Sequence, residues 1–229
     1  MNTNMRISDT IRSVFTKDEI NPVVSLIGPS HAEEVVIRML TAVCAVSLDE
    51  KTAQDVQKLF SNDYLRVYTL TDEIGAEYGA AYKNVIAVAS GILKGLGYGD
   101  NSRAALITRG LVEMTRYGML KGGKAETFFG LTGVGDLIVT CSSEHSRNFQ
   151  AGKEIGLSDN ASDFMAGNQK TVEGIRTCKV IHDDILKNYP DFEAPITNCV
   201  YDVLYENGKP SEKVKELMNR ALKSESIKG

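Results

Sequence analysis

Residues 73–96, EIGAEYGAAYKNVIAVASGILKGL, are the stretch that most restricts how this chain can fold. Apolar side chains recur there at the three- and four-residue spacing of an α-helix with one face turned to a core. They are Ile74, Tyr78, Tyr82, Val85, Ile86, Ala89, Leu93 and Leu96. The pattern therefore predicts a long helix over residues 73–96.

Lys83 lies on a different side of this predicted helix, on a face whose other members are Ala76, Ala80 and Ala87. Side chains of so little bulk leave room for a ligand to approach the ammonium group. A lysine in such a place can have a lowered pKa, as proton transfer requires. A solvated lysine on a tightly packed helix is the simpler interpretation of this stretch alone.

Strand and helix patterns alternate before residue 72. Strands are predicted at 22–27, 41–47 and 65–71, and helices at 7–15, after Gly28 with Pro29 in the first turn, and at 51–62. Such alternation is typical of a parallel βαβ sheet. Strand patterns then stop, and helices are predicted at 73–96, 102–118, 134–143, 146–155, 171–188, 195–206 and 211–224. We expect residues 1–71 and 72–229 to form separate domains.

Composition excludes several classes of function. The net charge of −4 and the pI near 5.5 argue against a nucleic-acid-binding surface. No apolar run reaches the roughly 18 residues of a membrane span, and no secretory signal precedes residue 15, so we expect a cytoplasmic protein. The four cysteines and three histidines are dispersed, which argues against a metal site.

Two further stretches have residues suited to ligand binding. Gly133 and Gly135 bracket a turn that delivers Asp136 to the start of a helix, where a carboxylate is favoured by the helix dipole, although ordinary capping explains it equally well. Ser146-Arg147-Asn148 opens the next helix, and its N-cap, guanidinium and amide are suited to a phosphate. Gly28-Pro29-Ser30 follows a strand, the usual position of ligand contacts in an open α/β sheet. The sequence contains no GxGxxG and no P-loop.

Five motifs in order resemble the bacterial-type NAD(P)-dependent glycerol-3-phosphate dehydrogenase family. They are LIGPSHAEE, YGAAYKNVIAVASGI, NSRAALITRGLVEM, TFFGLTGVGDLIVTCSSEHSRN and TVEG, and the resemblance as a whole runs from about residue 24 to about residue 206. The resemblance implies a mainly α fold. Residues 72–229 would form a helical substrate-binding and dimerisation domain of the 6-phosphogluconate dehydrogenase C-terminal type. Residues 1–71 would be the C-terminal remnant of a dinucleotide-binding Rossmann domain.

The resemblance also implies roles for individual residues. Lys83 matches the proton-transferring lysine, which also binds substrate. The other substrate contacts would be Gly28, Ser30, Asp136, Ser146, Arg147 and Asn148, and the contacts to NAD or NADP would be Ala32, Arg147, Thr171 and Glu173. Asp136 would hold a substrate hydroxyl or orient Lys83. Three residues depart from the family pattern: His31 and Tyr82 replace the usual phenylalanine and leucine, and Thr171 replaces a valine.

The implied reaction is reversible hydride transfer between the cofactor and glycerol 3-phosphate, which supplies glycerol 3-phosphate for phospholipid synthesis. The family also makes a homodimer an expectation. Because the dinucleotide fingerprint is missing, we expect the 229-residue chain to be inactive by itself. The alternative is a truncated, non-catalytic helical module for dimerisation or partner binding.

Overall fold

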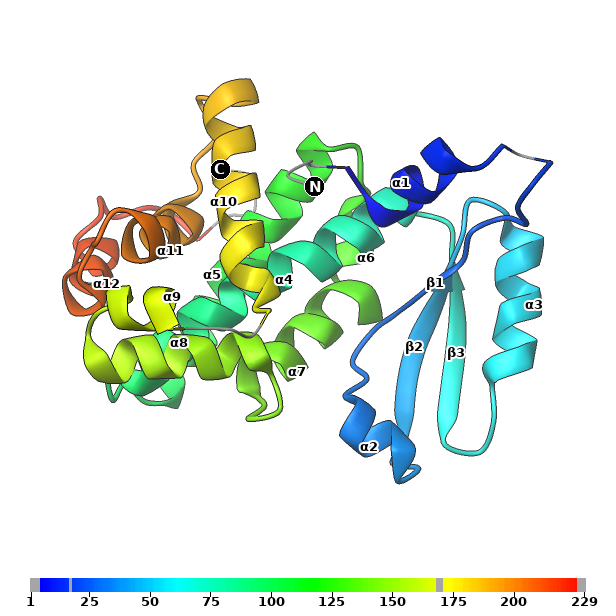
Figure 1. Ribbon diagram of the computed structural model, residues 1–229, viewed down its shortest axis with the longest axis horizontal. Helices are drawn as coiled ribbons and strands as arrows, with labels where there is room; N and C mark the ends of the chain where they lie inside the picture. The colour runs from blue at the N-terminus through cyan, green and yellow to red at the C-terminus, as the bar shows by residue number, and fades with distance from the viewer. Residues whose placement is uncertain (1–4, 17, 168–170, 226–229) are drawn as a thin grey trace.

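The computed structural model describes residues 5–16, 18–167 and 171–225. The strands gather at one side of the molecule and most helices at the other (Figure 1). The strand-containing part comprises α1 (Ile7–Val14), β1 (Ser25–Ile27), α2 (Ala32–Val36), β2 (Thr41–Val46), α3 (Glu50–Phe60) and β3 (Leu65–Leu70). In the described part of the chain, no helix combines the length and apolar character that crossing a membrane requires.

The helical part begins with α4 (Glu73–Gly95) and α5 (Asp100–Leu120). It continues with α6 (Ala125–Phe128), the π-helical turn η1 (Leu131–Gly135), α7 (Asp136–Ser142), α8 (Arg147–Ser158), α9 (Ser162–Gly167), α10 (Glu173–Asn188), α11 (Pro195–Tyr205) and α12 (Pro210–Met218). The predicted fold class, a mainly helical domain preceded by a short α/β part, is confirmed.

The three strands form one sheet in the order β1-β2-β3. β2 and β3 are parallel, as predicted, with Thr41 opposite Leu65, and α3 makes the crossover between them. β1 is antiparallel to β2, with Ser25 opposite Val46, so the predicted parallel arrangement is wrong for the first strand.

The connection between β1 and β2 explains this orientation. A parallel crossover must carry the chain back along the strand, usually by a helix. Here the connection holds a helix of five residues, and it ends near Arg38, whose backbone is left-handed with φ of 61°. α2 lies near one end of the strands (Figure 1), and the chain turns back there into β2.

The start of α2 also differs from the prediction. Pro29 was expected in the first turn of a helix that continues through residues 31–40, but the helix begins at Ala32 and His31 is its N-cap. Pro29 therefore belongs to the loop before the helix. That loop contains Gly28 and Ser30, two of the predicted site residues.

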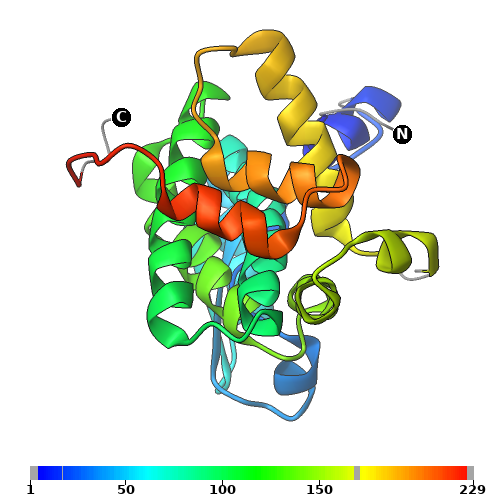
Figure 2. The ribbon, with the colours of Figure 1, turned by 90° about the vertical axis from the view of Figure 1, so that its left-hand side faces the viewer.

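α4 is the centre of the helical part. Helices α5, α7, α8, α10 and α11 all pack against it (Figures 1 and 2). Its N-cap Asp72 accepts from the backbone N–H of Gly75 at 3.0 Å and from that of Lys124 at 2.8 Å. One buried carboxylate thus caps α4 and also fixes the segment that enters α6.

Glycines let α8 approach α4 at close range. A methyl group on Gly91 of α4 would lie 2.1 Å from the carbonyl oxygen of Phe149, and one on Gly152 of α8 would lie 2.0 Å from that of Val88. Gly95 and Gly156 repeat the arrangement one turn further along. Because both helices have small residues every fourth position at the contact, their backbones come almost into contact, which fixes the start of α8 relative to Lys83.

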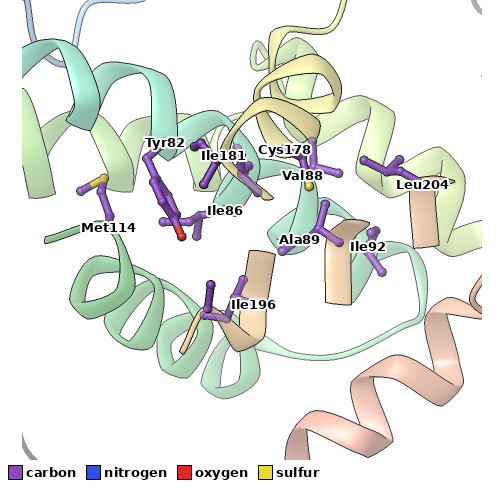
Figure 3. Packing of buried hydrophobic residues seen from close by; sticks show 14 of the residues in the cluster. Tyr82, Ile86, Val88, Ala89, Ile92, Met114, Cys178, Ile181, Ile196 and Leu204 are labelled. Atoms are coloured by element: carbon purple, nitrogen blue, oxygen red, sulfur yellow. The ribbon is translucent and has the colours of Figure 1, made fainter. Parts of the chain in front are cut away.

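The hydrophobic core surrounds the inner face of α4. In Figure 3, Tyr82, Ile86, Val88, Ala89 and Ile92 face side chains from α5, α10 and α11. Tyr82, Ile86 and Ala89 belong to the apolar stripe predicted for the long helix, whereas Val88 and Ile92 do not, because residues 85–93 are buried on every side of α4.

Tyr82, one of the three departures from the family pattern, has a polar partner in this core. Its hydroxyl donates to Glu113 of α5 at 2.9 Å, and the same carboxylate accepts from the backbone N–H groups of Ile196 and Thr197 at 2.9 Å each. Burial raises the pKa of Glu113, although these donors act in the opposite direction. The network joins α4, α5 and the first turn of α11, whose N–H groups have no partner within their own helix.

Most helix boundaries agree with the prediction to within a few residues. α6, η1 and α9 were not predicted, because each is about one turn long and has too few apolar positions for a periodicity. The predicted helix 134–143 begins at Asp136 because the π-helical turn occupies the residues before it. The last helix ends at Met218, earlier than the predicted residue 224.

Candidate functional site

Lys83 and Asp136 form the central pair of the candidate site. Nζ of Lys83 lies 2.5 Å from Oδ2 of Asp136, and the two side chains are 18% and 5% exposed. Lys83 comes from the middle of α4, whereas Asp136 is the first residue of α7 and follows the π-helical turn. Asp136 therefore contacts Lys83 directly, and a contact with a substrate hydroxyl stays a prediction.

The environment of Asp136 has opposing effects on its ionisation. Burial raises the pKa of Asp136, whereas the charge and hydrogen bond of Lys83 lower it, with smaller contributions from Thr140 and His31. Thr140 Oγ1 donates to the Asp136 backbone oxygen at 2.6 Å, one turn further along α7. The carboxylate of Asp136 therefore lies where it can hold the ammonium group of Lys83 in place.

The small-residue face around Lys83 serves partly for packing. Ala76 is fully buried against Cys44 and Val46 of β2, and a methyl group on Gly79 would lie 3.0 Å from the carbonyl oxygen of Thr132 in η1. The sheet and the π-helical turn therefore cover the part of this face that precedes Lys83. The small residues bring the Asp136 turn close to the lysine.

Ser146, Arg147 and Asn148 open α8 as predicted. Ser146 is the N-cap, and its hydroxyl accepts from the N–H of Phe149 at 3.2 Å. Arg147 is 62% exposed and forms an ion pair with Glu173, which is 41% exposed. An exposed pair of this kind is worth about 0–1 kcal/mol, so a ligand anion can replace the carboxylate at little cost.

Asn148 is buried and joins three helices. Its Nδ2 donates to Oδ1 of Asn84 at 2.9 Å, and its Oδ1 accepts from the N–H of Gly174 at 2.8 Å. Gly174 has no room for a side chain, since a methyl group there would lie 2.4 Å from the carbonyl oxygen of Asn84. The first turns of α8 and α10 are therefore fixed beside the residue that follows Lys83.

The 28–32 loop lies against the same region. A methyl group on Gly135, the residue before Asp136, would lie 3.7 Å from Cδ of Pro29. Gly28 is buried with a φ of 154°, and the exposed Ser30 donates its hydroxyl to the Gly28 carbonyl at 3.1 Å. Ala32 at the start of α2 is exposed.

Some predicted site residues contact one another or a neighbour, Gly28 and the N-cap Ser146 are buried, and the others are exposed. Lys83 contacts Asp136, Arg147 contacts Glu173, and Asn148 contacts Asn84 and Gly174. Ser30, Ala32 and Thr171 are exposed. Sequence reasoning missed Asn84 and Gly174, whose signals were their positions next to Lys83 and Glu173. Within the described residues, no group of three or more His, Cys, Asp or Glu side chains is arranged to hold a metal ion.

The fold is a helical domain that follows part of an α/β unit, and its candidate site is a lysine paired with a buried carboxylate. The family model described as NAD-dependent glycerol-3-phosphate dehydrogenase C-terminus matches residues 72–215, and the corresponding N-terminus model matches residues 1–53. The chain belongs to the NAD-dependent glycerol-3-phosphate dehydrogenase family.

Individual relatives support this family assignment. The chain is 48% identical over 223 residues to glycerol-3-phosphate dehydrogenase [NAD(P)+] of Lacticaseibacillus casei, a match that covers 97% of this chain and 63% of the relative. The Listeria innocua protein of the same name is also 48% identical, with 97% and 65% covered. The chain therefore spans less than two thirds of the length of these relatives.

Solved structures match the fold. The crystal structure of glycerol-3-phosphate dehydrogenase from Coxiella burnetii has a TM-score of 0.81 at 37% identity, covering 87% of this chain and 61% of that one. The Plasmodium falciparum enzyme has a TM-score of 0.85 at 22% identity, covering 97% and 63%, and at that identity it supports the fold alone.

Proposed function

We propose that this chain carries the substrate-binding and proton-transferring part of a glycerol-3-phosphate dehydrogenase. The reaction is reversible hydride transfer between NAD or NADP and glycerol 3-phosphate, with dihydroxyacetone phosphate as the ketone. The observation that carries the proposal is the 2.5 Å pair of Lys83 and Asp136. The names of the relatives support the substrate and the cofactor.

Lys83 is the proposed proton donor. When the ketone is reduced, negative charge develops on its oxygen, and an ammonium group close by stabilises that charge and then donates a proton. In the opposite direction, neutral Lys83 accepts the hydroxyl proton. Asp136, one hydrogen bond away, holds Nζ in place for both directions.

Ser146, Arg147 and Asn148 are proposed to hold the phosphate. The first turn of α8 offers backbone N–H groups, and the guanidinium of Arg147 matches two phosphate oxygens once it leaves Glu173. Asn148 already has partners on α4 and α10, so its main contribution is to fix this helix terminus. Gly28 and the exposed hydroxyl of Ser30 are proposed as further substrate contacts.

Ala32, Arg147, Thr171 and Glu173 are proposed to contact the cofactor. Ala32 and Thr171 are exposed and Glu173 is half-buried, which fits contact with a large ligand that arrives from outside the helical part. The pyrophosphate-binding turn GxGxxG is not among these 229 residues. We accordingly propose that residues 1–71 belong to a dinucleotide-binding domain and residues 72–229 to the substrate domain.

We further propose a cytoplasmic, homodimeric protein that supplies glycerol 3-phosphate for phospholipid synthesis. All four cysteines are free thiols, and three of them are buried, as suits a reducing compartment. Light scattering of the purified protein measures the oligomeric state directly.

A chimera tests the proposed activity. The 229 residues are joined to the cofactor-binding part of the Lacticaseibacillus relative, of which this chain covers 63%. We expect the chimera to oxidise NADH or NADPH with dihydroxyacetone phosphate and to act slowly on dihydroxyacetone. A folded chimera that binds cofactor yet reduces neither ketone would contradict the proposal and favour the non-catalytic binding module.

A further inference from the structure

His31 is the residue of the 28–32 loop that the proposed reaction leaves without a role. It precedes α2, and its ring contacts that of His145, the residue before the N-cap of α8. The ring centroids are 5.8 Å apart and the planes are inclined by 59°. The contact therefore joins the α/β part to the helical part at the terminus where the phosphate is proposed to bind.

One atom of this contact is unsatisfied. Nε2 of His31 is buried and has no hydrogen-bond partner among the described residues. Buried polar atoms in folded proteins are nearly always bonded, and an exception indicates a missing partner such as a ligand or a water molecule. Simple packing of one ring on another explains the contact with His145 but does not satisfy this nitrogen.

Two observations place His31 beside the Lys83–Asp136 pair. Pro29, two residues before it, packs next to Gly135, and Gly135 directly precedes Asp136. In addition, a charge on His31 is close enough to Asp136 to oppose the effect of burial on that carboxyl group. The loop thus brings an imidazole toward Asp136.

We propose that His31 is a further substrate-contacting residue, whose Nε2–H donates a hydrogen bond to an oxygen of the phosphorylated three-carbon substrate. This inference rests on the function proposed above. It assigns His31 to substrate affinity and leaves proton transfer to Lys83. It also explains why a polar ring at this position is useful where the family commonly has phenylalanine.

The three histidines of the chain allow a direct test by proton NMR of their imidazole signals. His182 is an internal control, because it lies in α10 and stacks on Tyr201 of α11, with ring centroids 3.6 Å apart. Glycerol 3-phosphate, inorganic phosphate and glycerol are titrated separately into the full chain. We expect glycerol 3-phosphate to shift the His31 signal saturably and to leave that of His182 unchanged.

Matched variants separate a hydrogen bond from packing. His31→Phe keeps a ring without the donor, whereas His31→Gln keeps an N–H at a similar distance from the backbone. We expect calorimetry to show that glycerol 3-phosphate binds roughly tenfold or more weakly to H31F, and that H31Q recovers part of this loss. The control H182F should bind glycerol 3-phosphate as the unaltered chain does.

Two results would overturn the inference, and they have different consequences for the proposed function. If H31F binds glycerol 3-phosphate as the unaltered chain does, while Arg147→Ala abolishes binding, His31 is a packing residue and the proposed function stands. If neither the unaltered chain nor any variant gives a saturable response, the substrate contact and the proposed substrate site fall together.

Discussion

Asn148 donates from Nδ2 to Oδ1 of Asn84 at 2.9 Å, which joins the first turn of α8 to the residue that follows Lys83. Oδ1 of the same amide accepts from the backbone N–H of Gly174 at 2.8 Å, so Asn148 also holds the start of α10. The proposed phosphate-binding terminus and the proposed proton donor therefore depend on one buried side chain.

Asn148→Ala should lower the free energy of unfolding by about 1–3 kcal/mol, because Oδ1 of Asn84 and the buried N–H of Gly174 lose these partners. Urea unfolding followed by circular dichroism measures the change. Asn188→Ala is the control: this exposed asparagine donates to Asp184 at 2.9 Å, and its loss should cost less than about 0.5 kcal/mol. Equal effects of the two variants would show that the three-helix junction is unimportant for stability.

Gly152→Ala should destabilise the fold by about 1–3 kcal/mol or more, because the added methyl group would lie 2.0 Å from the Val88 carbonyl oxygen and would push α8 away from α4. Gly167→Ala is matched to it, since a methyl group there meets nothing within 4 Å, and alanine favours helix by about 1 kcal/mol. Thermal unfolding compares the two. A G152A variant with the melting temperature of the unaltered chain would mean that α4 and α8 separate readily.

Glu73 gives a prediction for acid conditions. Burial acts to raise its pKa, but Arg12 donates to both carboxylate oxygens at 2.7 Å and, together with Arg6, brings the pKa of Glu73 below its ordinary value. A lowered pKa in the folded state stabilises the protein above the ordinary glutamate value of about 4.3, and this contribution is lost as the pH falls through the folded pKa. We therefore expect α1 to be attached to α4 at neutral pH and to detach in acid.

Glu73→Gln tests this linkage. The melting temperature of E73Q should lie below that of the unaltered chain near pH 7, and the difference should shrink as the pH falls below about 4. Glu50→Gln, on the exposed start of α3, is the control and should show little difference at either pH. A difference in melting temperature between E73Q and the unaltered chain that stays constant with pH would contradict the predicted role of the Glu73 charge.

Arg147→Lys in the chimera should raise the KM for dihydroxyacetone phosphate roughly tenfold, because an ammonium group cannot reproduce the two parallel hydrogen bonds of a guanidinium. Dihydroxyacetone, which lacks the phosphate, should be reduced as before. Steady-state kinetics with both ketones measures the difference. An equal loss with both would assign Arg147 to the structure, through its pair with Glu173.

Local features could be predicted from the sequence, and contacts between distant segments could not. The apolar periodicity of α4 and the cap at Ser146 depend on neighbouring residues, and both were predicted. The orientation of β1 depends on how far the chain must travel before β2, which a strand pattern does not contain. The resemblance identified Lys83 and Asp136 as site residues, but their direct contact depends on the packing of η1 against α4, which only the structure displays.

The central claim is that Lys83 transfers the proton, and the turnover of Lys83→Met in the chimera tests it most directly. Methionine keeps the length of the side chain but removes the ammonium group that faces Asp136. Lys94→Met, an exposed lysine in the last turn of the same helix, is the matched control. We predict that kcat with dihydroxyacetone phosphate falls by roughly 10² or more in K83M and is unchanged in K94M. A K83M chimera with near-normal kcat would contradict the account.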